Sequence, residues 1–234
     1  MTVKIISNKT KDLHDKIYNI LAQELKTNEM SYQKFSNANG RPYQSYERID
    51  FEGLRWSVEK RIMEYGLKRF FNPESLTLDI GSNYGFFTNE FGFHCKEAHG
   101  IEPIAELNEI GQITAEFLGI SKKVKFFTET FEEFESSNKY DLITSLASFF
   151  TSDTKQRSTA NSYFGKIYNL IKTGGWLFYE STSYQKNPQD EDFAHYAPSL
   201  EALTFIKDNF VDVEYWESPS GPENLRLYIV ARKQ

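Results

Sequence analysis

Apolar residues divide the chain into an N-terminal stretch with helical spacing and a longer stretch in which strands and helices alternate. Residues 10–26 carry an apolar residue every three or four positions, which predicts an amphipathic helix. Its apolar face comprises Leu13, Ile17, Ile20, Leu21 and Leu25. Residues 27–50 are polar, with Gly40 and Pro42 as breakers, and predict a long loop. Helical spacing returns over residues 54–70, through Val58, Ile62, Met63 and Tyr65, and is expected to end near Gly66 or at residues 71–73.

From residue 76 onward, short apolar runs alternate with helical segments. The expected strands are 76–80, 98–101, 124–127, 140–146, 176–180, 211–216 and 225–231. The expected helices are one that follows Tyr84, and residues 103–118, 158–172 and 199–209. The helix 103–118 has Phe117 on its inner stripe and ends at Gly119, and the helix 158–172 is ended by Gly174-Gly175. This alternation predicts an α/β fold with a Rossmann-like, doubly wound, mostly parallel sheet. Pro219, Gly221 and Pro222 predict a turn that makes the last two strands an antiparallel hairpin.

The first strand runs into a glycine-containing turn with an acid before it. Asp79, Gly81 and Gly85 form the pattern D-x-G-x-x-x-G, and Glu102 follows about 20 residues later at the end of the second strand. This is typical of a βαβ unit that holds the nucleoside end of a cofactor, with the acid accepting from the ribose hydroxyls. The G-x-G-x-x-G spacing that binds a pyrophosphate is missing. We therefore expect an adenosine without a diphosphate, for which S-adenosylmethionine is the common ligand.

Polar and small residues follow four successive strands. They are Asp79–Gly85, Glu102, residues 128–131 and residues 145–149, which include Ser145. In open α/β sheets, ligands bind outside the carboxyl ends of the strands, so these segments are expected to line one crevice.

Four blocks of the chain resemble the class I S-adenosylmethionine-dependent methyltransferases. They are residues 78–87 (LDIGSNYGFF), 100–103 (GIEP), 140–147 (YDLITSLA) and 170–180 (LIKTGGWLFYE), in that order. The resemblance implies a seven-stranded sheet with strand 7 antiparallel. It also implies that the Asp79–Gly85 turn, with Ser82 and Asn83, holds the methionine and ribose parts, and that Glu102 with Pro103 holds the ribose.

The resemblance assigns the adenine to the segment after the third strand. Many relatives place an aspartate there, whereas this chain has Thr130 near that position. A threonine hydroxyl can accept one hydrogen bond, and Phe131 can pack on the adenine ring. Glu129 is the alternative acceptor.

Before the first strand stand residues 43–46 (YQSY) and 52–61 (EGLRWSVEKR). They resemble the corresponding part of methyltransferases that act on surface glycans and of those that act on a tRNA wobble uridine. In those enzymes an upstream polar segment and an arginine close over the cofactor. We expect Arg55, with Arg61 as second choice, to pair with the methionine carboxylate, because a guanidinium fork matches two oxygens. The expected division is an N-terminal helical lid extension over residues 1–72 and a methyltransferase domain over residues 73–234.

Transfer to an oxygen requires a base within hydrogen-bond reach of the acceptor. Glu180, at the end of the fifth strand, and His195, in a polar stretch, are the candidates. Residues 183–198 are polar and aromatic, suit a hydroxyl-rich acceptor such as a sugar, and would form a lid with residues 27–50. The fourth strand lacks the D/N-P-P-Y motif of amino methylation, and the isolated Cys95 argues against cytosine C5 methylation. The spacing of histidines and acids suggests no structural metal, whereas a catalytic Mg²⁺ held by acidic residues stays open.

Composition narrows the partners and the compartment. The single cysteine among 234 residues fits a reducing compartment, and the absence of a signal peptide or an apolar stretch of about 18 residues makes cytoplasm the expected location. Residues 1–70 carry 13 Lys/Arg against 9 Asp/Glu, whereas residues 71–234 carry 14 against 24. A nucleic-acid partner usually requires a stronger basic surface.

The expected activity is therefore O-methylation of a carbohydrate or another small hydroxylated acceptor. A tRNA-modifying methyltransferase is the alternative within enzymes. A non-catalytic subunit that binds the cofactor and stabilises an active partner is the alternative outside them.

Overall fold

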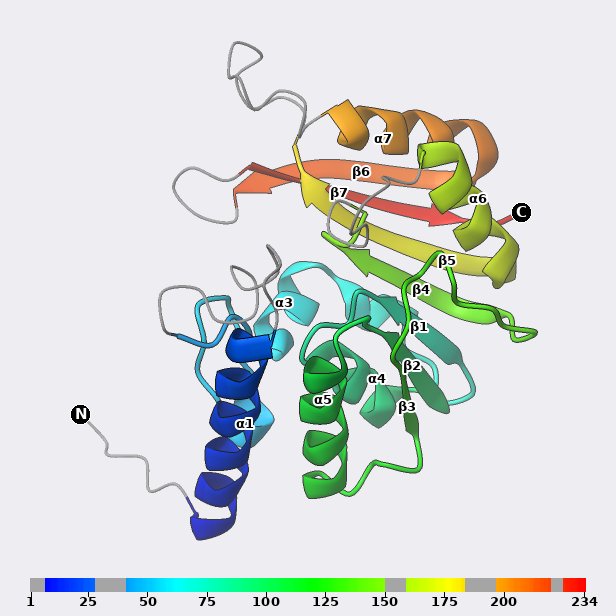
Figure 1. Cartoon of the computed structure of the whole chain (residues 1–234). Helices are drawn as coiled ribbons and strands as arrows, with labels where there is room; N and C mark the ends of the chain where they lie inside the picture. The colour runs from blue at the N-terminus through cyan, green and yellow to red at the C-terminus, as the bar shows by residue number, and fades with distance from the viewer. Residues whose placement is uncertain (1–6, 28–40, 150–158, 184–196, 220–224) are drawn as a thin grey trace. The chain divides into compact units, whose positions relative to one another are not determined.

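The computed structural model describes residues 7–27, 41–149, 159–183, 197–219 and 225–234, and its strands form one mixed sheet (Figure 1). The strands are β1 (Leu76–Ile80), β2 (Glu97–Ile101), β3 (Val124–Phe127), β4 (Tyr140–Leu146), β5 (Ile171–Thr182), β6 (Val211–Pro219) and β7 (Leu225–Arg232). Their order is β3-β2-β1-β4-β5-β7-β6. β4 pairs in parallel with β1 and β5, whereas β7 is antiparallel to both β5 and β6. The expected seven-stranded sheet with an antiparallel last strand is confirmed.

Six α-helices and two 3-10 turns accompany the sheet in the described ranges. They are α1 (Asn8–Thr27), η2 (Glu47–Ile49), α3 (Val58–Glu64), η3 (Leu67–Phe70), α4 (Phe86–His94), α5 (Ala105–Phe117), α6 (Ala160–Leu170) and α7 (Ala197–Asn209). None of these helices is long and apolar enough to cross a bilayer.

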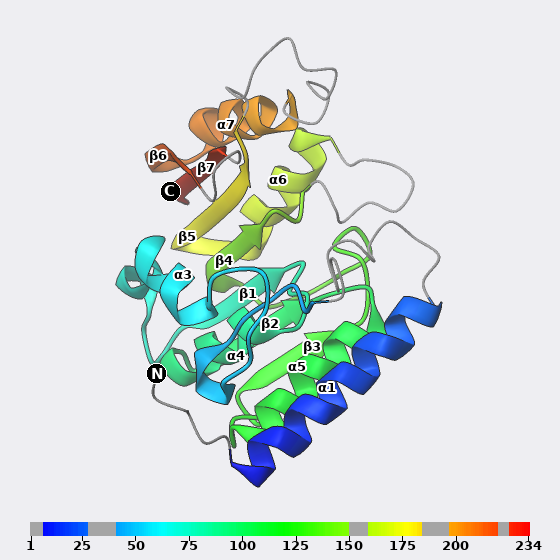
Figure 2. The same cartoon turned by 90° about the vertical axis from the view of Figure 1, so that its left-hand side faces the viewer.

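The chain divides into two compact units. The first comprises Met1–Glu74 and Ser82–Thr128, and the second comprises Ser75–Gly81 and Glu129–Gln234. In the first unit α1 runs alongside α5 (Figure 2), and the predicted face of α1 is buried at Leu13, Ile17 and Leu21. In the second unit α6 and α7 pack on each other, and α7 also contacts β6 and β7. The boundary near residue 72 stays a prediction.

The helical spacing over residues 54–70 forms two shorter elements, and the first stops near Gly66, one of its two expected ends. α3 ends because Gly66 adopts a left-handed conformation with φ 66°, which a continuing helix does not allow, and η3 follows. Ile62 is buried, but its neighbour Met63 is 60% exposed and does not belong to the apolar face. Phe117 is also wrongly predicted as inward: it is 39% exposed, because the buried stripe of α5 passes through Thr114 and Ala115 instead.

The glycine pair after α6 does not end that helix. α6 ends at Leu170, and β5 begins at once with Ile171 and runs through Gly174 and Gly175. The register with β4 jumps from Tyr140↔Ile171 to Leu142↔Trp176, so the glycines lie in an irregular stretch that absorbs extra residues. Gly174 has φ 77°, which explains a glycine at that position.

The segment before α3 is more ordered than the predicted loop. Within residues 41–58, Tyr46 pairs with Phe51 across η2, and Ser45 pairs with Ser57. We call residues 42–58 the lead-in segment. Residues 28–40, 184–196 and 220–224, which carry the predicted lids, His195 and most of the hairpin turn, lie outside the described residues, as does the side chain of Leu25.

Candidate functional site

The turn that follows β1 is tightly folded and needs its glycines. In the first unit, the N–H of Ser82 donates to the carbonyl of Ile101 over 2.9 Å, and that of Gly85 donates to the carbonyl of Ser82. Gly85 has φ 68°, and a Cβ there would lie 2.5 Å from a ring carbon of Phe126. No larger residue fits at Gly85, which lies against β3, while the Ser82 N–H ties the turn to the end of β2.

The preceding residues, which belong to the second unit, are also closely packed. Asp79 is buried and accepts a hydrogen bond from the Thr144 hydroxyl over 2.8 Å. Gly81 has φ 70°, and a Cβ added to it would lie 2.6 Å from the Cβ of Ser148. Asp79 and Gly81 therefore lie at the carboxyl end of β1. This end is next to the carboxyl end of β4, where Ile80 pairs with Ser145.

Glu102 is held in one orientation by the backbone of its own unit. Its Oε2 accepts the N–H of Asn83 over 3.1 Å, and its Oε1 accepts the N–H of Ile104 over 3.2 Å. The residue is only 7% exposed. A carboxylate is an acceptor with two oxygens, which is the group that a pair of ribose hydroxyls needs. The carboxylate is thus tied directly to the glycine turn, as the predicted pairing of Glu102 with that turn requires.

Asn108 was not predicted, although it connects the ends of two strands. Its Nδ2 lies 2.7 Å from the carbonyl of Glu102, 3.1 Å from that of Phe127 and 3.0 Å from the Thr128 hydroxyl. It is buried on α5, four residues after Ile104. A polar residue at i+4 on an apolar stripe was the available signal.

We expect Asn108→Ala to lower the free energy of unfolding by about 1–3 kcal/mol, because two strand-end carbonyls lose a buried donor. Urea denaturation measures this. Asn209 supplies the control, since its amide donates to a carbonyl on an exposed part of α7. Equal costs for Asn108→Ala and Asn209→Ala would contradict the bridging function of Asn108.

Two buried polar atoms on the turn lack hydrogen-bond partners in the described part of the chain, and we call them orphaned. They indicate whether a nucleoside fits there. The Ser82 hydroxyl and the Asn83 side-chain carbonyl are buried, and neither finds a hydrogen-bond partner among the described residues. Buried polar atoms are normally satisfied, so each indicates a missing partner. The turn therefore offers a donor and acceptors beside the Glu102 carboxylate, which is the chemistry that ribose hydroxyls require.

The segment after β3 forms a capped turn. Thr130 Oγ1 lies 2.9 Å from Glu133 Oε2, and the same hydroxyl accepts the N–H of Glu133. Phe131 is buried against Tyr163, with ring centroids 5.0 Å apart, and Lys166 lies over its ring. The predicted contacts of Thr130 and Phe131 with adenine stay predictions.

Three buried hydroxyls form a hydrogen-bonded cluster in the second unit. Ser145, Ser148 and Tyr163 lie 2.8–3.1 Å from one another. The backbone reaches this arrangement through Ala147, whose φ is 62°. Ser145 thus belongs to a buried polar cluster at the end of β4, and Ser148 of the same cluster lies beside Gly81.

The lead-in segment is hydrogen-bonded to the glycine turn of the same unit. The N–H of Tyr43 donates to the hydroxyl of Tyr84 over 3.0 Å. Arg55 donates from Nη1 to the Tyr43 hydroxyl over 3.2 Å, and its backbone N–H donates to the Tyr43 carbonyl. Arg61, the second choice, is buried, donates to Gln44 over 3.0 Å and lies over the Phe87 ring.

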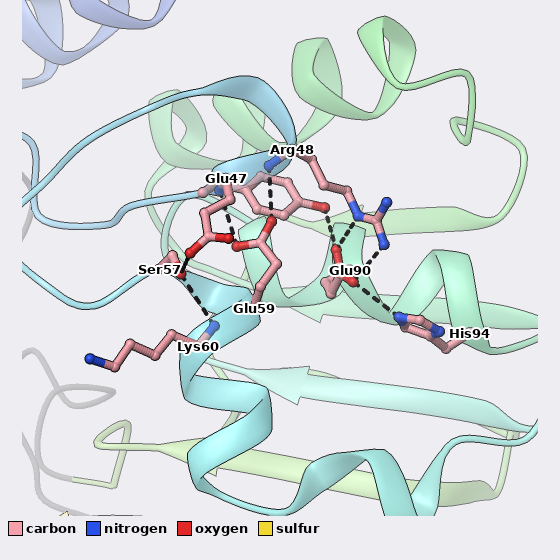
Figure 3. Close-up of polar contacts among 8 residues, drawn as sticks. Glu47, Arg48, Ser57, Glu59, Lys60, Glu90 and His94 are labelled. Carbon is pink, nitrogen blue, oxygen red and sulfur yellow. Dashed lines mark hydrogen bonds and ion pairs between the residues drawn. The ribbon is translucent and has the colours of Figure 1, made fainter. Parts of the chain in front are cut away.

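A second anchor joins the lead-in segment to α4 (Figure 3). Glu90 accepts from Arg48 Nε over 2.5 Å and Nη2 over 2.8 Å, and from the Tyr46 hydroxyl over 2.9 Å. Its other neighbour is His94, 3.0 Å away. Burial raises the pKa of Glu90, but the hydrogen bonds from Arg48, His94 and Tyr46 outweigh it and hold the pKa below its usual range.

The two candidate bases differ in what the structure shows of them. Glu180 is fully buried on β5 and forms an ion pair with Arg226, Nε to Oε1, at 3.0 Å. Arg226 also donates to Thr182. His195 lies outside the described residues. Among the residues that are described, no group of three or more His, Cys, Asp and Glu side chains could hold a metal ion.

Comparisons with known proteins identify the fold. No family model matches the chain, and no curated protein matches its sequence. Solved structures do match. The N-methyltransferase NodS from Bradyrhizobium japonicum WM9, in complex with S-adenosyl-L-homocysteine, has a TM-score of 0.59 at 18% identity, covering 94% of this chain and 99% of that one.

Two further solved structures show the same architecture. A SAM-dependent methyltransferase from Geobacter sulfurreducens, in complex with S-adenosyl-L-homocysteine, has a TM-score of 0.59 at 13% identity, covering 76% of this chain and 92% of that one. An rRNA methylase from Streptococcus thermophilus has a TM-score of 0.55 at 12% identity, covering 73% and 94%. The chain therefore has the class I methyltransferase fold.

Proposed function

We propose that this protein is an S-adenosylmethionine-dependent methyltransferase that methylates an oxygen of a carbohydrate or another small hydroxylated acceptor. The observation that carries the cofactor is the buried Glu102 carboxylate, held by the N–H of Asn83 beside the orphaned Ser82 hydroxyl. Two of the solved structures with this fold contain S-adenosyl-L-homocysteine. That ligand is the product that S-adenosylmethionine leaves after methyl transfer.

The proposed cofactor residues are those that the sequence predicted. Glu102 and Pro103 bind the ribose, and the backbone of Gly81–Gly85 passes close to the cofactor. Asp79 and Ser145 flank that turn, Thr130 and Phe131 take the adenine, and Arg55 takes the methionine carboxylate. The orphaned oxygens of Ser82 and Asn83 gain partners when the cofactor binds.

When bound, the cofactor supplies an activated methyl group on a sulfonium, so the protein mainly positions the acceptor. A hydroxyl acceptor must also lose a proton to a base. Glu180 is a buried carboxylate whose Oε1 lies 3.0 Å from Arg226 Nε. We keep both predicted bases, Glu180 and His195, as candidates.

The acceptor class is proposed from charge. Residues 71–234 carry 24 Asp/Glu against 14 Lys/Arg, and this range contains the second unit. The negative surplus disfavours a polyanionic acceptor. The positive surplus of residues 1–70 and the rRNA methylase of the same fold favour the alternative, a tRNA-modifying enzyme. The non-catalytic alternative is a subunit that binds cofactor for a partner. The single buried Cys95 fits a cytoplasmic location.

Calorimetric titration with S-adenosylhomocysteine tests the cofactor, with NAD and FAD as controls. We expect binding of S-adenosylhomocysteine alone; a chain that binds only NAD or FAD would refute the proposal.

Transfer of a labelled methyl group to a panel of free sugars, nucleotide sugars and glycans then tests the acceptor. Filter binding to tRNA at several salt concentrations separates the alternative, because phosphate contacts give a steep salt dependence. A chain that binds cofactor but methylates no acceptor alone would support the non-catalytic subunit.

A further inference from the structure

A hydrogen bond joins the glycine turn, residues 81–85, to the lead-in segment. Tyr84 lies within the turn, between Asn83 and Gly85, and is fully buried. Its hydroxyl accepts the N–H of Tyr43, which lies 41 residues earlier in the chain. Burial raises the pKa of the Tyr84 hydroxyl, so this group stays a neutral phenol.

Tyr43 in turn holds Arg55 by three contacts. The Tyr43 carbonyl accepts the Arg55 N–H over 3.0 Å, and the Tyr43 hydroxyl accepts from Arg55 Nη1 over 3.2 Å. The guanidinium carbon lies 5.7 Å from the centre of the Tyr43 ring, within the range of a cation–π contact. Arg55 is thus held at both its backbone and its guanidinium by one half-buried tyrosine.

The surrounding backbone fixes Tyr43 and Arg55 further. The Ser45 hydroxyl donates to the Arg55 carbonyl over 2.6 Å and accepts the Gly53 N–H over 2.8 Å. A Cβ on Gly53 would lie 2.2 Å from the Gln44 carbonyl oxygen, so only glycine permits this close approach. These hydrogen bonds hold the backbone of the lead-in segment in one conformation around Ser45.

We propose that Tyr84 and Tyr43 are positioning residues that aim Arg55 at the carboxylate of the cofactor's methionine part. The inference rests on the proposed cofactor. It adds that the turn that binds the nucleoside also fixes the residue that recognises the other end of the same ligand. Recognition of the ribose by Glu102 and of the methionine carboxylate by Arg55 is then preorganised within the first unit.

The test compares two ligands that differ only in the carboxylate: S-adenosylhomocysteine and its decarboxylated analogue, S-adenosyl-3-thiopropylamine. We expect Tyr84→Phe to raise the Kd of S-adenosylhomocysteine about five- to tenfold, as the loss of one buried hydrogen bond does, and that of the analogue less than about twofold. Arg55→Gln should have the same selectivity with a larger effect. The double variant should lose no more than Arg55→Gln alone, because both changes remove one interaction.

Tyr46→Phe is the matched control. Tyr46 is also a fully buried tyrosine that anchors the lead-in segment, but its hydroxyl donates to Glu90 and contacts neither Tyr43 nor Arg55. It should leave the ratio of the two Kd values unchanged. If Tyr84→Phe does not fold, Tyr43→Phe removes only the hydroxyl that accepts from Arg55 and should show the same selectivity.

Equal weakening of both ligands by Tyr84→Phe or Tyr43→Phe would overturn the inference and leave the proposed function intact. A change of the Kd ratio by Tyr46→Phe as large as that by Tyr84→Phe would also overturn it. A wild-type protein that binds neither ligand would instead refute the proposed function itself.

Discussion

Glu102→Ala is expected to weaken binding of S-adenosylhomocysteine about tenfold to a hundredfold, since hydrogen bonds to a charged group contribute roughly 1.5–3 kcal/mol. The substitution removes the proposed acceptor of the ribose hydroxyls. It also releases the N–H groups of Asn83 and Ile104, which the carboxylate holds in place. The loss should appear equally with S-adenosylhomocysteine and with its decarboxylated analogue, because both carry the ribose. Calorimetric titration with the two ligands measures it.

Glu109 provides the control for this prediction. It is an exposed acid on the same helix, α5, so Glu109→Ala changes the net charge equally without touching the turn. We expect its Kd to match that of the wild type. Glu102→Gln, which keeps one carbonyl acceptor, should fall between wild type and Glu102→Ala. An unchanged Kd for Glu102→Ala would remove the ribose from this site.

The sheet could be predicted because its signals are local. Each strand is a short apolar run bounded by turn residues, and the turn after β1 is set by Gly81 and Gly85, whose left-handed backbone few other residues adopt. The departures arise where a local signal has two meanings. Gly174 and Gly175 mark an irregularity inside β5 as readily as the end of a helix. Met63 lies next to buried Ile62, and only packing decides which of the two faces inward.

The site could be predicted only in part, because its supporting contacts are distant in sequence. Glu102 follows from its place after β2, but Asn108 as its neighbour depends on how α5 packs against the ends of β2 and β3. Tyr84 stood in the predicted turn, yet its bond to Tyr43 spans 41 residues. Glu90 lies in an apolar helix, and its partner Arg48 is 42 residues away. No periodicity or spacing rule joins such pairs.

Glu90→Ala is expected to lower the free energy of unfolding by about 2–4 kcal/mol, somewhat below the roughly 3–5 kcal/mol of a fully buried pair. The expected cost is below that of a fully buried pair because the Arg48 side chain is 35% exposed and regains contact with water. The Tyr46 hydroxyl stays buried and loses its acceptor, which adds to the cost. Urea denaturation measures the change. Glu64→Ala removes an exposed acid from α3 nearby and should cost no more than about 0.5 kcal/mol.

The pH dependence of this difference separates a charged network from simple packing. Because the folded pKa of Glu90 is lowered, the folded state binds its proton less readily than the unfolded chain does. The stabilisation by the Glu90 carboxylate is therefore complete above the unfolded value of about 4.3 and is lost as pH falls through the folded pKa. The stability difference between wild type and Glu90→Ala should shrink when urea denaturation is repeated below about pH 4. A difference that stays constant toward acid would show that Glu90 stabilises the protein by packing, since the volume of its side chain does not titrate.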